Sequence, residues 1–183
     1  FYIAALTELY HATLNREYLE KAERFCQEAV GRFADDINGG FYLADGDSAE
    51  LFMNPKEIYD GAIPSGNGVM TYNFVRLYQL TDKEEYRELA QKQIHYMAGR
   101  AQEYLTGHGM FLFAKLLYDN PPAHIVVALK DRLELENIRK QLPFLANVIV
   151  VSDSVEYPLV NDRTTFYVCK GHVCLEPVNA LSS

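Results

Sequence analysis

An internal repeat constrains the fold of this 183-residue chain more than any other feature. Seven residues between positions 9 and 22 recur in the same order 68 positions later. The matched pairs are Leu9 and Leu77, Tyr10 and Tyr78, Thr13 and Thr81, Glu17 and Glu85, Tyr18 and Tyr86, Glu20 and Glu88, and Ala22 and Ala90. Each unit has the pattern of an α/α hairpin, which cannot bury its apolar stripe alone. The hairpins are therefore expected to stack side by side, as in solenoids and helical toroids.

Apolar residues at spacings of three and four predict five helices in the front part of the chain. The expected ranges are 2–13, 15–34, 64–80, 82–105 and 109–118. Asn15 is the expected N-cap of the second helix, and Thr81 or Asp82 that of the fourth. In an up-and-down order the third and fifth helices start at the same rim. The loops 60–67 and 106–108 are therefore expected to face a common opening.

The pattern changes at Pro121-Pro122. Short apolar runs at 124–129 and 147–152 flank helical spacing at 133–145, which predicts a βαβ unit with parallel strands. Segments 165–169 and 173–177 are expected to form a terminal hairpin. The predicted fold class is mainly α: a partial (α/α) toroid of antiparallel helical hairpins over 1–120, and a small C-terminal α/β appendage over 121–183.

Charge and hydropathy exclude several classes of partner. The chain has 17 Lys and Arg against 25 Asp and Glu, a net charge of −8, so nucleic acid and anionic membranes are not expected partners. No apolar run is long enough for a transmembrane helix, and the start shows neither a basic leader nor a cleavage motif. We therefore expect a cytoplasmic protein. The amphipathic start without methionine indicates a chain cut from something longer.

The three cysteines do not indicate a disulfide framework. Cys26 lies in a helical pattern and is expected to be a buried thiol. If Gly171-His172 forms a two-residue turn, Cys169 and Cys174 lie opposite each other on paired strands. A bridge between them is one alternative, and free thiols in a reducing cytoplasm are the favoured one.

Metal and cofactor signatures do not appear in the sequence. The five histidines have neither H-x-x-x-H nor Cys/His spacing, so no metal site is predicted. No glycine-rich nucleotide-binding motif follows a strand, and no cofactor is predicted.

The stretch 39–68 is the predicted location of a site. It is far longer than the roughly 2–8 residues that join helices in bundles. It also concentrates glycines, aromatic residues and carboxylates, which a binding loop on a rigid scaffold would contain.

Several motifs in the chain carry a family resemblance. G-G-F-Y at 39–42, P-K-E-I-Y-D-G-A-I-P-S-G-N at 55–67 and T-T-F-Y-V-C at 164–169, with Cys174, resemble the thioredoxin-domain proteins related to the spermatogenesis-associated thioredoxin-like protein. The resemblance implies that the chain is the C-terminal part of a protein with a thioredoxin-like domain in front. It also implies a toroid similar to those of six-hairpin glycosidases and N-acylglucosamine 2-epimerases. Because the chain contains no C-x-x-C, a redox site would lie in that front part.

Toroids of this kind imply a carbohydrate or small polar ligand. Glycoside chemistry needs two carboxyl groups about 5–9.5 Å apart, and epimerase-like chemistry needs a histidine base. The candidate catalytic residues are Asp45, Asp47, Glu57, Asp60 and His108. The candidate ligand contacts are Tyr42, Tyr59, Ser65 and Asn67.

A structural alternative stands beside this hypothesis. The Asp-Gly pairs at 45–46 and 60–61 are also turn formers, Asn67 is also a helix cap, and Lys56-Glu57 is also a surface charge pair. The alternative function is a non-catalytic binding or scaffold module that serves the thioredoxin-like domain. Exposed helix faces of an incomplete ring also predict self-association.

Overall fold

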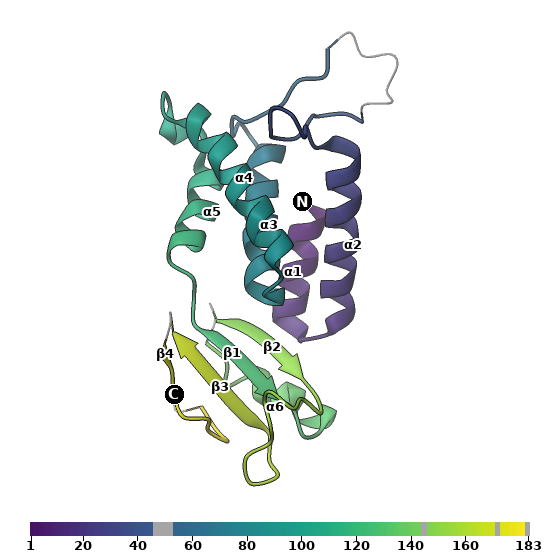
Figure 1. Ribbon diagram of the computed structural model, residues 1–183, viewed down its shortest axis with the longest axis vertical. Helices are drawn as coiled ribbons and strands as arrows, with labels where there is room; N and C mark the ends of the chain where they lie inside the picture. Colours follow the sequence, from purple (N-terminus) through teal and green to yellow (C-terminus); the bar gives the residue numbers. More distant parts are fainter. Residues whose placement is uncertain (46–52, 144–145, 171–172, 182–183) are drawn as a thin grey trace.

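The computed structural model describes residues 1–45, 53–143, 146–170 and 173–181. About half of the chain is helical, and a small mixed sheet lies beyond one end of the helices (Figure 1). The long helices are α1 (Tyr2–Thr13), α2 (Arg16–Phe33), α3 (Gly66–Thr81), α4 (Glu84–Ala101) and α5 (Gly109–Asp119). The predicted mainly α class with an α/β appendage is confirmed.

The helices are arranged as the repeat predicts. α1 packs against α2 and α3 against α4, while α5 packs mainly against α3. In Figure 1, α5 and α2 lie at opposite edges of the helical layer. None of the helices in the described part of the chain is both long and apolar enough to cross a lipid bilayer.

The offset of 68 residues also appears in local structure. Thr13 and Thr81 each donate Oγ1 to the carbonyl four residues earlier, at 2.7 Å in both cases. The next residues, Leu14 and Asp82, both end their helix in the left-handed conformation, with φ of 55°. The two hairpins therefore turn in the same way.

The start of α4 differs from the prediction. Asp82 ends α3, so α4 begins only at Glu84, and its N-cap Lys83 makes no side-chain capping bond. Thr81 and Asp82 are therefore not the cap. Glu84 and Glu85 occupy the first turn of α4, where the positive end of the helix dipole favours them.

The appendage forms a four-stranded sheet in the order β2-β1-β3-β4. Its strands are β1 (His124–Ala128), β2 (Asn147–Val151), β3 (Thr165–Lys170) and β4 (Val173–Cys174). β1 pairs with β2 in parallel, as predicted, and β3 pairs antiparallel with both β1 and β4.

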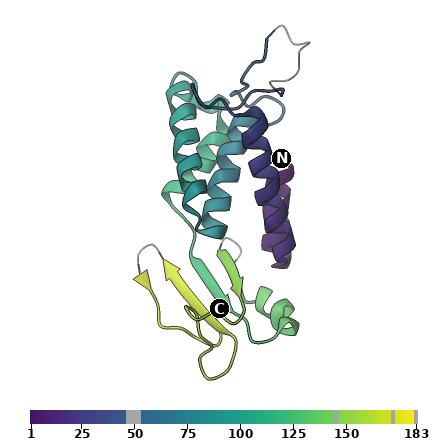
Figure 2. The ribbon, with the colours of Figure 1, turned by 45° about the vertical axis from the view of Figure 1, so that its right-hand side comes forward.

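The connection between β1 and β2 is less helical than the sequence predicts. A 3-10 turn (Arg132–Glu134) and the short α6 (Leu135–Arg139) replace the expected helix over 133–145. Pro143 keeps a helix here from reaching residue 145, since proline disfavours helical backbone in the residue before it, but α6 ends earlier still, at Arg139. Ile138 is the buried residue of α6, which covers one face of the sheet (Figure 2).

The sheet packs directly on the helices. The Tyr10 hydroxyl on α1 donates to the Val148 carbonyl of β2 at 3.0 Å, and Leu14 belongs to the apolar cluster of the sheet. On α3, the Arg76 guanidinium donates to the Asn147 side chain at 2.6 Å. These contacts fix the appendage at the end of the helices opposite the long loop.

Cys169 and Cys174 face each other in the β3–β4 register and form a disulfide. The favoured prediction of free thiols is therefore wrong for this pair, because the strand pairing brings the two sulfur atoms together. Cys26 is a free, fully buried thiol, as predicted, and burial raises its pKa to about 12.

Candidate functional site

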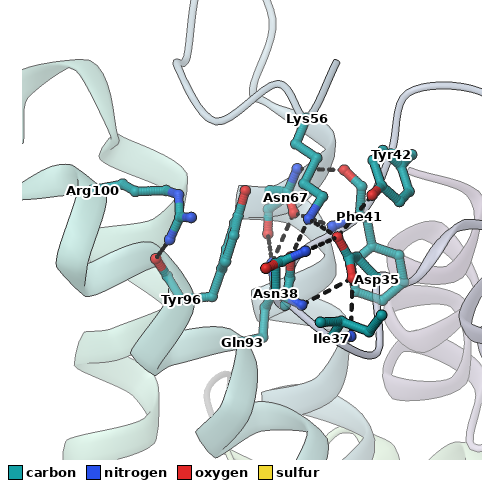
Figure 3. Close-up of polar contacts among 11 residues, drawn as sticks. Asp35, Ile37, Asn38, Phe41, Tyr42, Lys56, Asn67, Gln93, Tyr96 and Arg100 are labelled. Carbon is teal, nitrogen blue, oxygen red and sulfur yellow. Dashed lines mark hydrogen bonds and ion pairs between the residues drawn. The ribbon is translucent and has the colours of Figure 1, made fainter. Parts of the chain in front are cut away.

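The side-chain amide of Asn67, in the first turn of α3, fastens the long loop to that helix. Its Oδ1 accepts from the Phe41 backbone amide at 2.7 Å, and its Nδ2 donates to the carbonyls of Phe41 at 2.9 Å and Glu57 at 2.7 Å (Figure 3). Gln93 on α4 donates to the same Oδ1 at 3.1 Å. Asn67 is 1% exposed, so this predicted ligand contact holds two separate parts of the loop, at Phe41 and at Glu57, from inside the protein.

A charged network lies beside this clamp. Lys56 Nζ donates to Asp35 Oδ2 and to the Gly39 carbonyl, both at 2.6 Å, and lies 4.6 Å from the ring centroid of Tyr42. The Tyr42 hydroxyl donates to the same Asp35 oxygen at 2.7 Å. The hydrogen bond from Lys56 is the main reason why the pKa of Asp35 lies well below its usual value. Lys56 therefore pairs with Asp35 and is not part of a local pair with Glu57.

The two glycines before Phe41 let this turn press against α4. Gly39 and Gly40 have φ of 74° and 77°, and a Cβ at Gly40 would lie 2.3 Å from the Tyr96 ring. Arg100 covers that ring, with Cζ 3.8 Å from its centroid (Figure 3). A groove of about 630 Å³ runs between the turn and α4.

Asp60 joins the starts of two helices. Its Oδ1 accepts from the Ser65 amide at 2.8 Å, and its Oδ2 accepts from the Met110 amide at 2.7 Å. Ser65 is the N-cap of α3 and accepts from the Gly68 amide at 3.1 Å. The loops before α3 and α5 therefore meet at one rim, as the up-and-down order predicts.

His108 lies at the same rim and is 4% exposed. Its Nδ1 lies 2.8 Å from the Tyr104 carbonyl, so Nδ1 carries a proton and donates to that oxygen. Nε2 is buried without a hydrogen-bond partner among the described residues. Tyr59 stacks on Tyr104 and meets His108 edge-on, with centroids 6.1 and 6.4 Å apart.

The predicted carboxylates do not share one environment. Asp45 pairs with Arg32 at 2.7 Å, Asp60 accepts from the two helix starts, and Glu57 is exposed. Asp47 lies outside the described residues. The structure thus gives each described carboxylate a different neighbourhood.

Three of the predicted residues line one pocket. Tyr42, Glu57 and Asn67 border a cavity of about 220 Å³ between the end of α2, the start of α3 and the loop. Most of its walls are apolar, from Phe33, Phe41, Leu43, Val69 and Met70, among others. Sequence reasoning missed Asp35, Tyr96 and Arg100, although the adjacent glycines at 39–40 were a signal for a close backbone approach.

The fold and this site define a protein of helical hairpins with a mixed α/β appendage and a long loop clamped over the rim. No protein-family model matches the chain. It is similar to an uncharacterized protein of Caenorhabditis elegans, 26% identical over 206 residues that cover 99% of this chain and 26% of the relative. Spermatogenesis-associated protein 20 is 23% identical in rat and in human, over 97% of this chain and 25% of each relative. The chain thus spans about a quarter of the length of these distant relatives.

Proposed function

We propose that this chain is the rear part of a thioredoxin-domain protein with a toroid like those of carbohydrate-processing enzymes, and that the 41–67 loop forms a cleft for a carbohydrate or small polar ligand. The observation that carries the proposal is the pocket shared by Tyr42, Glu57 and Asn67. Two stacked hairpins and the quarter-length match to the relatives support the wider assignment.

The walls of the pocket suit a sugar. Phe33, Phe41 and Tyr42 offer aromatic surface to the apolar face of a sugar ring, as small-molecule sites usually do. The exposed Glu57 carboxylate offers acceptors for hydroxyl groups. Stacking and hydrogen bonds of this kind bind a sugar without any proton transfer.

Scaffolding is the second candidate, and the contacts of Asp60, Ser65 and Asn67 favour it. These three residues hold the loop and the helix starts in place, so backbone amides and a backbone carbonyl already occupy side-chain atoms that could otherwise bind a ligand. In this alternative the loop is a rigid surface for the thioredoxin-like domain of the parent protein.

A thermal-shift screen of the chain against mono- and disaccharides, sugar phosphates and acylated amino sugars tests the proposal. A ligand at a hundred times its Kd adds about 2.7 kcal/mol of stability, which is easily seen. Glu57→Gln should reduce the shift, whereas Glu88→Gln, an exposed change on α4, should leave it intact. No shift with any sugar, or equal shifts in both variants, would refute the carbohydrate cleft and favour the scaffold.

We also propose self-association through exposed apolar residues on α5 and at the start of α1. Leu112 and Leu116 on α5 are 37% and 59% exposed, and Phe1 and Tyr2 at the start of α1 are 61% and 58% exposed. Covering such surface releases water and favours association. Light scattering should detect a dimer or larger species at micromolar concentration, and a monomer would contradict the proposal.

A further inference from the structure

Arg76 lies near the end of α3 that is remote from the long loop. Its hydrogen-bond partners are unusual for a buried cation. It is 7% exposed, and its Nη1 donates to Asn147 Oδ1 at 2.6 Å and to Gln79 Oε1 at 3.1 Å. Both acceptors are neutral amides. None of the ion pairs in the described part of the chain involves Arg76. Buried charges usually have an ionic partner, because removing a charge from water is costly.

The guanidinium of Arg76 has more donors than its two amide partners use. An arginine side chain carries five N–H donors, and the two amide bonds start from Nη1, which carries two of them. The other three are on Nε and Nη2. The guanidinium also makes a hydrogen bond to the Tyr72 hydroxyl, which leaves it with further donors for a ligand. The edge of the guanidinium that carries Nε and Nη2 is planar and matches the two oxygens of a carboxylate.

A small pocket adjoins Arg76 where the helices meet the sheet. Its volume is about 180 Å³, and its walls include Tyr72, Phe113 and Pro122. The Tyr72 and Phe113 rings stack, with centroids 5.9 Å apart and planes 19° apart. The pocket is therefore of a size for one small molecule, with a rigid aromatic wall beside a buried cation.

The carboxylate of Glu8, whose charge is opposite to that of Arg76, borders the same pocket. The Tyr72 hydroxyl donates to Glu8 Oε1 at 2.6 Å. Burial and this carboxylate raise the pKa of Tyr72 to about 12, while the Arg76 guanidinium acts in the opposite direction. One hydroxyl thus lies between the negative and the positive group. His11 also borders the pocket, with its Nε2 3.1 Å from the Ala146 carbonyl.

We propose that this pocket binds a small zwitterion of the amino-acid class, with its carboxylate on Arg76 and its ammonium group at Glu8. A simple carboxylate would satisfy Arg76 but would face the negative charge of Glu8. A simple amine would face the positive charge of Arg76. An apolar side chain of the ligand would lie along Phe113 and Pro122. The site is separate from the cleft of the long loop and does not depend on the function proposed for that cleft.

Three probes of one shape test the assignment: L-leucine, which carries both charges, 4-methylpentanoate, which carries the carboxylate, and 3-methylbutylamine, which carries the ammonium group. Calorimetric titration of the full 183-residue chain should show leucine binding about tenfold or more tightly than either analogue, the effect of one charge-assisted hydrogen bond. Leucine should also shift the Nε–Hε NMR signal of Arg76.

Two variants complete the test. Glu8→Gln keeps an acceptor for the Tyr72 hydroxyl but removes the charge, so the preference for leucine over 4-methylpentanoate should disappear. Glu88→Gln, an exposed carboxylate on α4, should leave the preference unchanged. Equal affinity for leucine and 4-methylpentanoate in the unaltered chain would overturn the proposal. So would an Arg76 signal that none of the three probes moves.

Discussion

Replacing Asn67 by alanine should destabilise the protein more than most single substitutions. The change removes the partner of the Phe41 amide and carbonyl, both in buried hydrogen bonds, and of the Glu57 carbonyl and the Gln93 side chain. A buried polar group left without a partner costs about 1–3 kcal/mol. Counting the two buried groups of Phe41 alone, the free energy of unfolding should fall by about 3 kcal/mol.

Urea unfolding followed by circular dichroism measures this change directly, because the midpoint falls in proportion to the lost stability. Asn54→Ala is the matched control in the same loop. Asn54 also makes two bonds to one backbone, with the Ala44 amide at 3.0 Å and the Ala44 carbonyl at 2.7 Å, but they are only partly buried and water can replace them. An Asn67→Ala midpoint no lower than that of Asn54→Ala would refute the clamp.

Two further predictions concern the neighbouring turn. Gly40→Ala places a Cβ 2.3 Å from the Tyr96 ring at a φ of 77°, so the free energy of unfolding measured in urea should fall by about 2–4 kcal/mol. Gly61→Ala is the control, because its Cβ would meet nothing within 4 Å, and it should cost less than about 1 kcal/mol. Equal losses would contradict the packing argument. Because Lys56 lowers the folded-state pKa of Asp35, the stability from this carboxylate is fully present above about pH 4 and is lost as the pH falls toward the folded-state value. Asp35→Asn should therefore flatten the fall in unfolding free energy below about pH 4, and an unchanged slope in acid would count against the network.

Much of the helical part could be predicted from local sequence. The apolar stripes and Asn15 placed α1 and α2 within a residue or two, and the Asn15 side chain accepts from the Glu17 amide as an N-cap should. The repeat predicted the second hairpin, including the buried Ala90 that matches Ala22. These features depend on residues three or four positions apart, which a helix brings together by its own geometry.

The sequence predictions that failed, for the helix over 133–145 and for the two cysteines, have a common cause. α6 ends at Arg139 although the helical spacing of the sequence continues to position 145, and the Cys169–Cys174 bond depends on strand register. Neither is a property of the local apolar pattern. The favoured free thiols followed from an expected compartment, whereas the pairing of β3 and β4 placed the two side chains opposite each other.

The same distinction between local sequence and tertiary contacts applies to the candidate sites. The sequence by itself determined that a long loop with glycines and carboxylates would lie at the rim where α3 and α5 start, because chain order fixes which helix ends are neighbours. Only the tertiary structure decided that Asp35 would pair with Lys56, 21 residues away, and that Arg76 would meet Asn147, 71 residues away. Such contacts join segments that nothing in the local sequence relates. They form when hydrophobic burial brings the hairpins, the loop and the sheet together, and it is there that buried charges find their partners.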